Sequence, residues 1–205
     1  LWAAKSSREF NLDEFNQGDY IGAVEAKVMS ENISKVLYPS DEAMAGKELR
    51  LKQQYFFVAA TLNDIFRRYR KMNRSFSELP NFVAIQLNDT HPAIAVPELM
   101  RLLLDEHGVG WDDAWTICQN TFAYTNHTVM PDALETWPVD LIGRLLPRHM
   151  EIIYDINHRF LEALRGRYPQ HPELPGRVSI IAEGAVKMVR MAHVGIVGSH
   201  SFISV

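Results

Sequence analysis

Two short polar segments of the chain combine the groups that could bind and act on a sugar. Residues 88–91 place a carboxylate and an imidazole two positions apart, and residues 124–128 are all polar, with Glu135 and Trp137 soon after. Sugar hydroxyls need planar hydrogen-bond donors and acceptors, whereas the C–H face of a sugar ring packs on a flat aromatic group. For residues 88–91, an ordinary turn closed by Asn and Asp is the favoured interpretation and a hydroxyl-binding site is the alternative. Residues 124–128 with Glu135 and Trp137 are typical of a sugar site, although such residues also serve structural roles.

Other chemistries fit the same side chains less well. Asp89 and Glu135 could form the two-acid pair of a glycosidase, an interpretation that depends on their separation. Asp89, His91 and His127 are a competing candidate metal site, but their spacing is not of the HExxH type and we expect no metal. Cys118 falls in a helix that we expect to be buried, which favours a core residue over a nucleophile. The sequence contains neither a glycine-rich phosphate loop nor a lysine in a setting that indicates Schiff-base chemistry.

Hydrophobic periodicity predicts helices that alternate with short strands. Apolar residues recur at helical spacing between Val58 and Tyr69, whereas the branched run at residues 83–87 ends in turn-forming residues and indicates a buried strand. The expected helices are residues 47–70, a segment that runs to Glu106 and stops at His107 and Gly108, residues 111–120, and residues 141–166 with a break or kink at Pro147; the second expected strand is residues 121–125.

This alternation favours a fold of the α/β class, with a mostly parallel sheet covered by helices. In such sheets, ligands bind at the loops beyond the carboxyl ends of the strands. Residues 88–92 follow the first expected strand and residues 126–131 follow the second. Both polar segments therefore occupy positions where a ligand is expected.

The composition excludes several classes of function. Among 205 residues, 47% are hydrophobic and 22% are charged, which is ordinary for a soluble globular protein. The net charge of −4 argues against a nucleic-acid partner, and no apolar stretch approaches the roughly 20 residues that a membrane span needs. The single cysteine, Cys118, cannot form an intramolecular disulfide, so we expect a cytoplasmic protein with no nucleic-acid or membrane partner.

Longer stretches of the sequence resemble a known enzyme family. Residues 84–92 (AIQLNDTHP) and 123–128 (AYTNHT) closely resemble the glycogen, starch and maltodextrin phosphorylases, which are α-1,4-glucan phosphorylases. The same resemblance extends over residues 1–5 (LWAAK), 31–39 (ENISKVLYP), 46–55 (GKELRLKQQY), 133–138 (ALETWP), 146–149 (LPRH) and 183–187 (EGAVK). It covers nearly the whole chain, and residues 111–114 (WDDA) resemble bacterial members.

The resemblance implies a longer, two-domain enzyme of the glycosyltransferase-B type, with Rossmann-like domains, in which residues 1–205 form the second half of the N-terminal domain. In this family, phosphate cleaves α-1,4-glucan to glucose 1-phosphate with retention, and pyridoxal phosphate assists as the proton partner. The cofactor lysine is expected in the C-terminal domain, outside this chain. We therefore expect the isolated chain to be inactive and the full protein to be a homodimer. A non-catalytic carbohydrate-binding or structural module is the alternative.

The family's motifs also assign roles to individual residues. His127 is expected to face the glucosyl unit, with its backbone carbonyl near the developing positive charge and its imidazole near the 6-hydroxyl. The expected substrate-binding residues are Asp41, Arg50, Asp89, His91, Ala133 and Glu135. Asp41 belongs to a gate loop expected to close over the cleft, where Glu42 and Ala43 depart from the family's pattern. A remote glycogen-storage site is expected at Tyr154, Asn157, Glu183 and Lys187, beside His158, which stands where animal enzymes have Gln.

Overall fold

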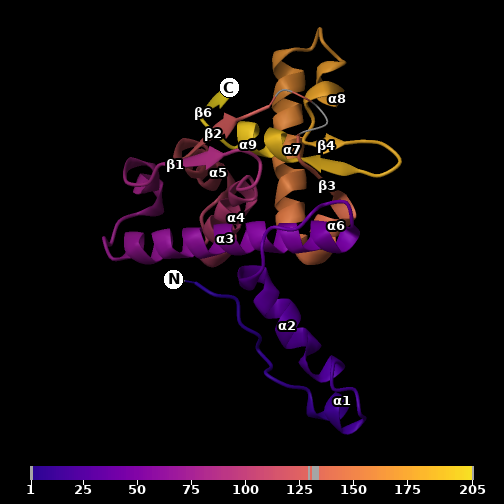
Figure 1. Ribbon diagram of the computed structural model, residues 1–205. Coiled ribbons are helices and arrows are strands. Elements are labelled where there is room, and N and C mark those ends of the chain that lie inside the picture. The colour runs from indigo at the N-terminus through magenta and orange to yellow at the C-terminus, as the bar shows by residue number, and fades with distance from the viewer. Residues whose placement is uncertain (1, 129, 131–133, 205) are drawn as a thin grey trace. The chain divides into compact units, whose positions relative to one another are not determined.

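The structure is a computed structural model that describes residues 2–128, 130 and 134–204 (Figure 1). It divides into two compact units, and the division falls between Ala60 and Thr61, within the long helix α3 (Met44–Arg70). Within the described residues, no helix is both long enough and apolar enough to cross a bilayer.

The first unit contains two helices ahead of α3. Asn11 precedes α1 (Leu12–Asn16), and its side-chain oxygen accepts from the backbone N–H of Asp13, as N-cap residues do. The N-cap of α2 (Gly22–Lys35) is Ile21, which forms no side-chain cap, but the N–H of Gly22 donates to Oδ1 of Asp19 at 2.8 Å. Between these helices the rings of Phe15 and Tyr20 pack edge to face, with 5.0 Å between their centroids.

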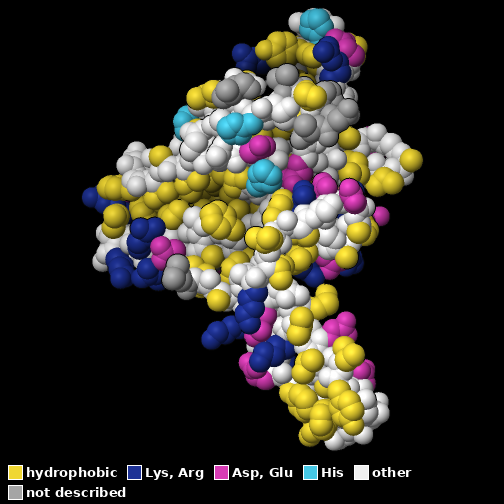
Figure 2. Space-filling view, viewed as in Figure 1, with side chains coloured by type: hydrophobic (Ala, Val, Ile, Leu, Met, Phe, Trp, Pro, Cys, Tyr) yellow, Lys and Arg dark blue, Asp and Glu magenta, His cyan; other side chains and the backbone are white. Residues whose placement is uncertain are grey.

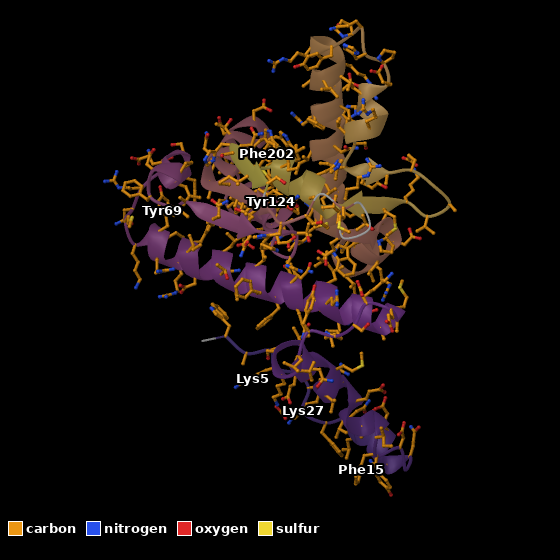
Figure 3. All side chains as sticks on the ribbon, turned by 45° about the horizontal axis from the view of Figure 1, so that its top comes forward. Lys5, Phe15, Lys27, Tyr69, Tyr124 and Phe202 are labelled. Atoms are coloured by element: carbon orange, nitrogen blue, oxygen red, sulfur yellow. The ribbon has the colours of Figure 1, made fainter. Side chains whose placement is uncertain are left out.

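The second unit is built on a parallel three-stranded sheet in the order β1-β2-β6 (Figure 1). The strands are β1 (Ile85–Asn88), β2 (Phe122–Asn126) and β6 (Ser201–Ser204). Tyr124 and Phe202, which are labelled in Figure 3, are register partners on β2 and β6. The chain passes from β1 to β2 through α4 (Ala95–Arg101), a π-helical turn (Leu102–Glu106) and α5 (Trp111–Thr121).

A second, antiparallel sheet has the order β3-β5-β4. Its strands are short: β3 (Thr136–Pro138), β4 (Ile181–Ala182) and β5 (Met188–Arg190). The remaining elements of this unit are the 3₁₀ helix at Phe76–Asn81 and the helices α6 (Val139–Leu145), α7 (Pro147–Arg167), α8 (Leu174–Val178) and α9 (Met191–Val197).

The predicted α/β class and the parallel strands that alternate with helices are confirmed. The break expected at Pro147 is also present, because Leu146 separates α6 from α7 and Pro147 begins α7, a position that needs no N–H donor. Gly108 has φ +63°, a left-handed conformation that suits glycine just past the end of a helix. The antiparallel sheet was not predicted, because strands of two or three residues show no period.

A buried ionic network ties α4 to α7. Glu98 is fully buried on α4 and accepts two hydrogen bonds from Arg101, at 2.8 and 2.9 Å, and one from Nε2 of His149 on α7, at 2.5 Å. Burial alone would raise the pKa of Glu98, but the hydrogen bonds from Arg101 and His149 outweigh it and hold that pKa below its usual range. The carboxylate therefore stays charged inside the core.

Candidate active site

The carboxyl ends of β1 and β2 lie side by side. Asn88, the last residue of β1, is the register partner of Thr125 on β2. The ladder continues one residue further, because the N–H of Asp89 donates to the carbonyl of Thr125 at 2.8 Å. The two polar segments singled out in the sequence therefore begin next to each other, at the edge of a parallel sheet where ligands bind.

His127 reaches from the loop after β2 to the end of β1. Its Nε2 atom lies 2.5 Å from Oδ1 of Asn88, and both side chains are exposed. A carboxamide oxygen only accepts hydrogen bonds, so Nε2 of His127 must carry the proton. In the neutral imidazole this leaves Nδ1 as an acceptor.

Asp89 adopts a strained but well-supported turn. Its φ is +68°, in the left-handed region that Asp tolerates better than most residues, and its Oδ1 accepts from the N–H of Thr90 at 2.6 Å. Thr90 is buried, whereas His91 is exposed. The turn role considered for this segment is thus real, and it places the Asp89 carboxylate at the strand end.

Tyr124 links the core to the loop that carries His127. The ring is fully buried on β2, and its hydroxyl donates to Oδ1 of Asn126 at 3.2 Å. The amide nitrogen of Asn126 donates in turn to the carbonyl of Thr128. Burial, followed by the negative charges of Asp89 and Glu135, raises the pKa of Tyr124 to about 12. Both carboxylates therefore act electrostatically on one hydroxyl, which brings Glu135 to the same region.

Glu135 is held by the second sheet. Its carbonyl accepts from the N–H of Met191 at 3.2 Å, and it lines a small cavity of about 150 Å³ together with Arg190 and His193. Trp137 follows on β3 and is only 2% exposed. Its ring is therefore part of the core of this unit and does not offer a face to a sugar. Ala133, expected beside Glu135, lies outside the described residues.

Asp41 and Arg50 belong to the first unit, where they contact each other. Nη1 of Arg50 lies 3.3 Å from Oδ2 of Asp41, and Nε of Arg50 donates to the carbonyl of Pro39 at 2.5 Å. The guanidinium also lies over the ring of Tyr38, 4.4 Å from its centroid. One arginine thus anchors the segment before α3 at three points.

The residues of the expected storage site have mixed surroundings. Tyr154 is exposed on α7, and Lys187 forms an exposed ion pair with Glu183, 3.1 Å apart. Asn157 is buried instead, where its oxygen accepts from the N–H of Ile180 at 2.8 Å and its nitrogen donates to Ser179 at 3.2 Å. Asn157 therefore joins α7 to the segment just before β4, a structural task that the sequence did not indicate.

Neither a metal nor an aldehyde cofactor finds a prepared site in the described residues. No group of three His, Cys, Asp or Glu side chains there is arranged to hold a metal ion. No described lysine is buried, although a desolvated lysine is the usual partner for Schiff-base chemistry. The lysines in this part of the chain thus do not fit pyridoxal phosphate.

Cys118 is buried on α5, and burial raises the pKa of its thiol well above the usual range. The interpretation of Cys118 as a core residue is confirmed.

Sequence reasoning missed two residues that shape this site. Asn88 lay within a recognised motif, but its contact with His127 joins residues 39 positions apart and depends on strand pairing. Gly195 on α9 lies where any side chain would collide with the ring of Tyr124. Neither an asparagine nor a glycine indicates such a contact in the sequence alone, because the contact depends on how distant segments pack.

The family model described as carbohydrate phosphorylase matches residues 1–205. Among curated proteins, glycogen phosphorylase 2 of Dictyostelium discoideum is 55% identical over 201 residues, covering 98% of this chain and 20% of that protein. The muscle form of glycogen phosphorylase from Ovis aries and the liver form from Homo sapiens are each 53% identical over 209 residues, covering 98% of this chain and 25% of those proteins.

The chain thus spans about a fifth to a quarter of the length of these relatives. The relatives named here come from a slime mould and two mammals, so the resemblance to bacterial members stays a prediction. The family model matches every residue, and the named relatives are more than half identical over 98% of the chain, so the chain belongs to the carbohydrate phosphorylase family.

Proposed function

We propose that this chain is part of the N-terminal domain of an α-1,4-glucan phosphorylase and supplies the side of the active site that faces the glucan. The single observation that carries the proposal is the cluster at the ends of β1 and β2, where His127 bonds to Asn88 and the charges of Asp89 and Glu135 converge on Tyr124. Relatives named glycogen phosphorylase match the chain over 98% of its length, which supports the same assignment.

The proposed reaction is phosphorolysis with retention at the anomeric carbon. A phosphate oxygen forms a bond to C1 of the terminal glucose, the bond between C1 and the glycosidic oxygen breaks, and that oxygen takes a proton from phosphate. The products are glucose 1-phosphate and a glucan shorter by one unit. Positive charge builds on the sugar as the bond breaks, so the carbonyl of His127 and the carboxylates of Asp89 and Glu135 would stabilise it electrostatically.

In this proposal His127 also binds the sugar directly, with its imidazole at the 6-hydroxyl. His91 and Ala133 line the channel beside the anomeric side. Asp41 belongs to the gate loop, whereas Arg50 lies on α3 and also faces the channel; the ion pair between them ties the base of the loop to α3. Tyr154, Glu183 and Lys187 would form a separate surface for polysaccharide storage. Asn157 would support it from the core, because its side chain accepts from the N–H of Ile180.

The cofactor of the full protein would be pyridoxal phosphate, held by a lysine outside this chain. When bound, its phosphate group supplies the proton exchange that the reaction needs. No residue of this chain is assigned to hold it, in keeping with the exposed or half-buried lysines seen here. The isolated chain is therefore expected to be inactive, and the cytoplasm is the compartment that we propose for the protein.

The full protein is proposed to be a homodimer. Apolar side chains gather over α1 and α2, as Figure 2 shows. The exposed members of this patch are Phe10, Leu12, Phe15, Tyr20, Ile21, Val24, Val28 and Met29. A contiguous exposed apolar patch usually marks a protein–protein contact, which supports a subunit interface in this part of the chain.

The test is an assay of the full-length protein with maltoheptaose and inorganic phosphate. Release of the α-anomer of glucose 1-phosphate, identified by NMR, is the expected result. The isolated 205-residue chain should release none under the same conditions. Absence of glucose 1-phosphate from the full-length protein reconstituted with pyridoxal phosphate would overturn the proposed function. Release from the isolated chain would overturn the assignment of the cofactor site to another part of the protein.

A further inference from the structure

The side chain of Asn88 lies where it can fix the imidazole of His127. Asn88 ends β1, and His127 lies two residues beyond Thr125, the register partner of Asn88. We propose that Asn88 is a positioning residue that holds His127 in the tautomer protonated at Nε2, so that Nδ1 presents its lone pair to a sugar hydroxyl. This inference rests on the proposed function, because it assigns a donor–acceptor direction to the contact between His127 and the sugar.

The chemistry of the pair sets that direction. A neutral imidazole has one N–H donor and one acceptor nitrogen, and free in water it exchanges between two tautomers. The Oδ1 atom of Asn88 accepts only, so the 2.5 Å contact favours the tautomer with the proton on Nε2. Nδ1 of the exposed ring is then an acceptor, and a sugar hydroxyl would donate to it.

A second anchor holds the backbone of His127. The Tyr124 hydroxyl bonds to Asn126, and the amide of Asn126 donates to the carbonyl of Thr128, so the residues on both sides of His127 are tied to the core. The ring is thus positioned from β1 and the backbone from β2. Restraints on both the ring and the backbone limit the conformations of His127, which lowers the entropic cost of ordering it against a ligand.

The titratable groups around this pair come from three elements. Asp89 and His91 lie in the loop after β1, Tyr124 lies on β2, and Glu135 precedes β3. Asn88 is the group that actually contacts the imidazole, and it is neutral at every pH. A carboxylate in its place would favour the doubly protonated imidazolium, which has two donors and no acceptor.

The experiment compares Asn88→Ala and Asn88→Asp with Gln86→Ala and Gln86→Glu in the full-length protein. Gln86 is a matched control, because it lies two positions earlier on β1, on the same face of the sheet, and bonds across to Thr125 at 2.8 Å without contacting His127. The measurements are kcat and KM for phosphorolysis of maltoheptaose across a range of pH, with the melting temperature of each variant as a check of folding.

Asn88→Ala should lower kcat/KM by about three- to tenfold, the loss expected when one hydrogen bond no longer fixes the tautomer. Asn88→Asp should move the acid limb of the pH profile to higher pH, because a carboxylate beside the ring favours the imidazolium, which has no acceptor nitrogen. Both Gln86 variants should keep the wild-type profile. A merely structural role for Asn88 would lower activity without moving the acid limb.

Nitrogen-15 NMR of the histidine imidazoles gives a readout that is independent of activity, with the His127→Asn variant used to assign the signal. The wild type should show His127 protonated at Nε2, and Asn88→Ala should show a mixture of tautomers. The inference would be overturned if the NMR spectrum of Asn88→Ala showed the wild-type tautomer of His127. It would also be overturned if the pH profile of Asn88→Asp had the same acid limb as that of Gln86→Glu. If the wild type released no glucose 1-phosphate, the proposed function would fail while the NMR result would still decide the tautomer.

Discussion

A Cβ atom on Gly195 would lie 2.7 Å from Cδ2 of Tyr124, so only glycine lets α9 approach β2 this closely. The contact matters because the hydroxyl of Tyr124 holds Asn126, which in turn bonds to the carbonyl of Thr128. The packing of a helix in the core is thus connected through two side chains, those of Tyr124 and Asn126, to the loop that carries His127.

Replacing Gly195 with alanine should therefore disturb both stability and activity. The added methyl group must displace the buried ring of Tyr124, and overpacking of this kind costs about 1–3 kcal/mol. Gly143→Ala on α6 is the matched control, since a Cβ there meets nothing within 4 Å and alanine stabilises a helix by up to about 1 kcal/mol. Urea denaturation of the two variants measures the difference, and equal stability would contradict this account of α9.

The buried Glu98 makes the stability of the second unit depend on pH. Its pKa is lowered in the folded state, so the unfolded chain binds more protons in acid and stability rises with pH. Glu98→Gln should lose about 3 kcal/mol at neutral pH, because Arg101 and His149 lose a charged partner.

The advantage of the wild type over Glu98→Gln should be complete above about pH 5 and should shrink as the pH falls through the lowered pKa of Glu98. Glu162→Gln, which removes an exposed partner of Arg165 on α7, should change stability little at any pH. A constant difference between the wild type and Glu98→Gln from pH 3 to pH 7 would contradict the role of ionised Glu98, and chemical denaturation at each pH provides the data.

The thiol of Cys118 should be unreactive in the folded protein. It is buried on α5 and its pKa is raised by burial, so the thiolate that reacts with disulfide reagents is scarce. Addition of Ellman's reagent at about pH 8 should give slow colour development in buffer and rapid development in guanidinium chloride. Rapid reaction of Cys118 in buffer would show that α5 opens easily and is not part of a stable core.

The proposed storage surface at Tyr154, Glu183 and Lys187 should bind polysaccharide but not affect the reaction of a short oligosaccharide. Lys187→Ala breaks the exposed pair with Glu183 and should weaken glycogen binding, while kcat for maltoheptaose stays unchanged. Lys35→Ala on α2 is the control, because Lys35 is exposed and also pairs with a glutamate, Glu31, four residues away. Co-sedimentation with glycogen measures binding, and equal retention of both variants would remove Lys187 from the storage site.

The sequence predicted those parts of the fold that have strong local patterns. The stripe of α3 at Val58, Leu62, Phe66 and Tyr69 is buried, and both predicted strands exist, with their ends shifted by one or two residues. Helix period and branched strand residues are local signals, so they can be recognised without the fold. The strands β3, β4 and β5 give no such signal, because each gains its structure from pairing with a distant segment.

The candidate site was predicted in its residue types but not in its contacts. His127, Asp89 and Glu135 were recognised by motif, whereas the bond between His127 and Asn88 depends on the register of two parallel strands. The burial of Trp137 and Asn157 could not be predicted from the sequence either, since both residue types also occur on sugar-binding surfaces. Contacts between distant segments are set by the packing of the whole unit, which a local pattern does not encode.

The central claim is that His127 binds the sugar at the strand-end site of a glucan phosphorylase. The most direct test is His127→Asn in the full-length protein, with release of glucose 1-phosphate from maltoheptaose and phosphate as the measurement. His171→Asn is the control, because His171 is also exposed and its imidazole Nδ1 lies 3.2 Å from the exposed carboxylate of Glu173. We expect kcat/KM to fall by roughly 100-fold or more for His127→Asn, with an unchanged melting temperature and a normal control. A His127→Asn enzyme that keeps wild-type kcat/KM would contradict the account.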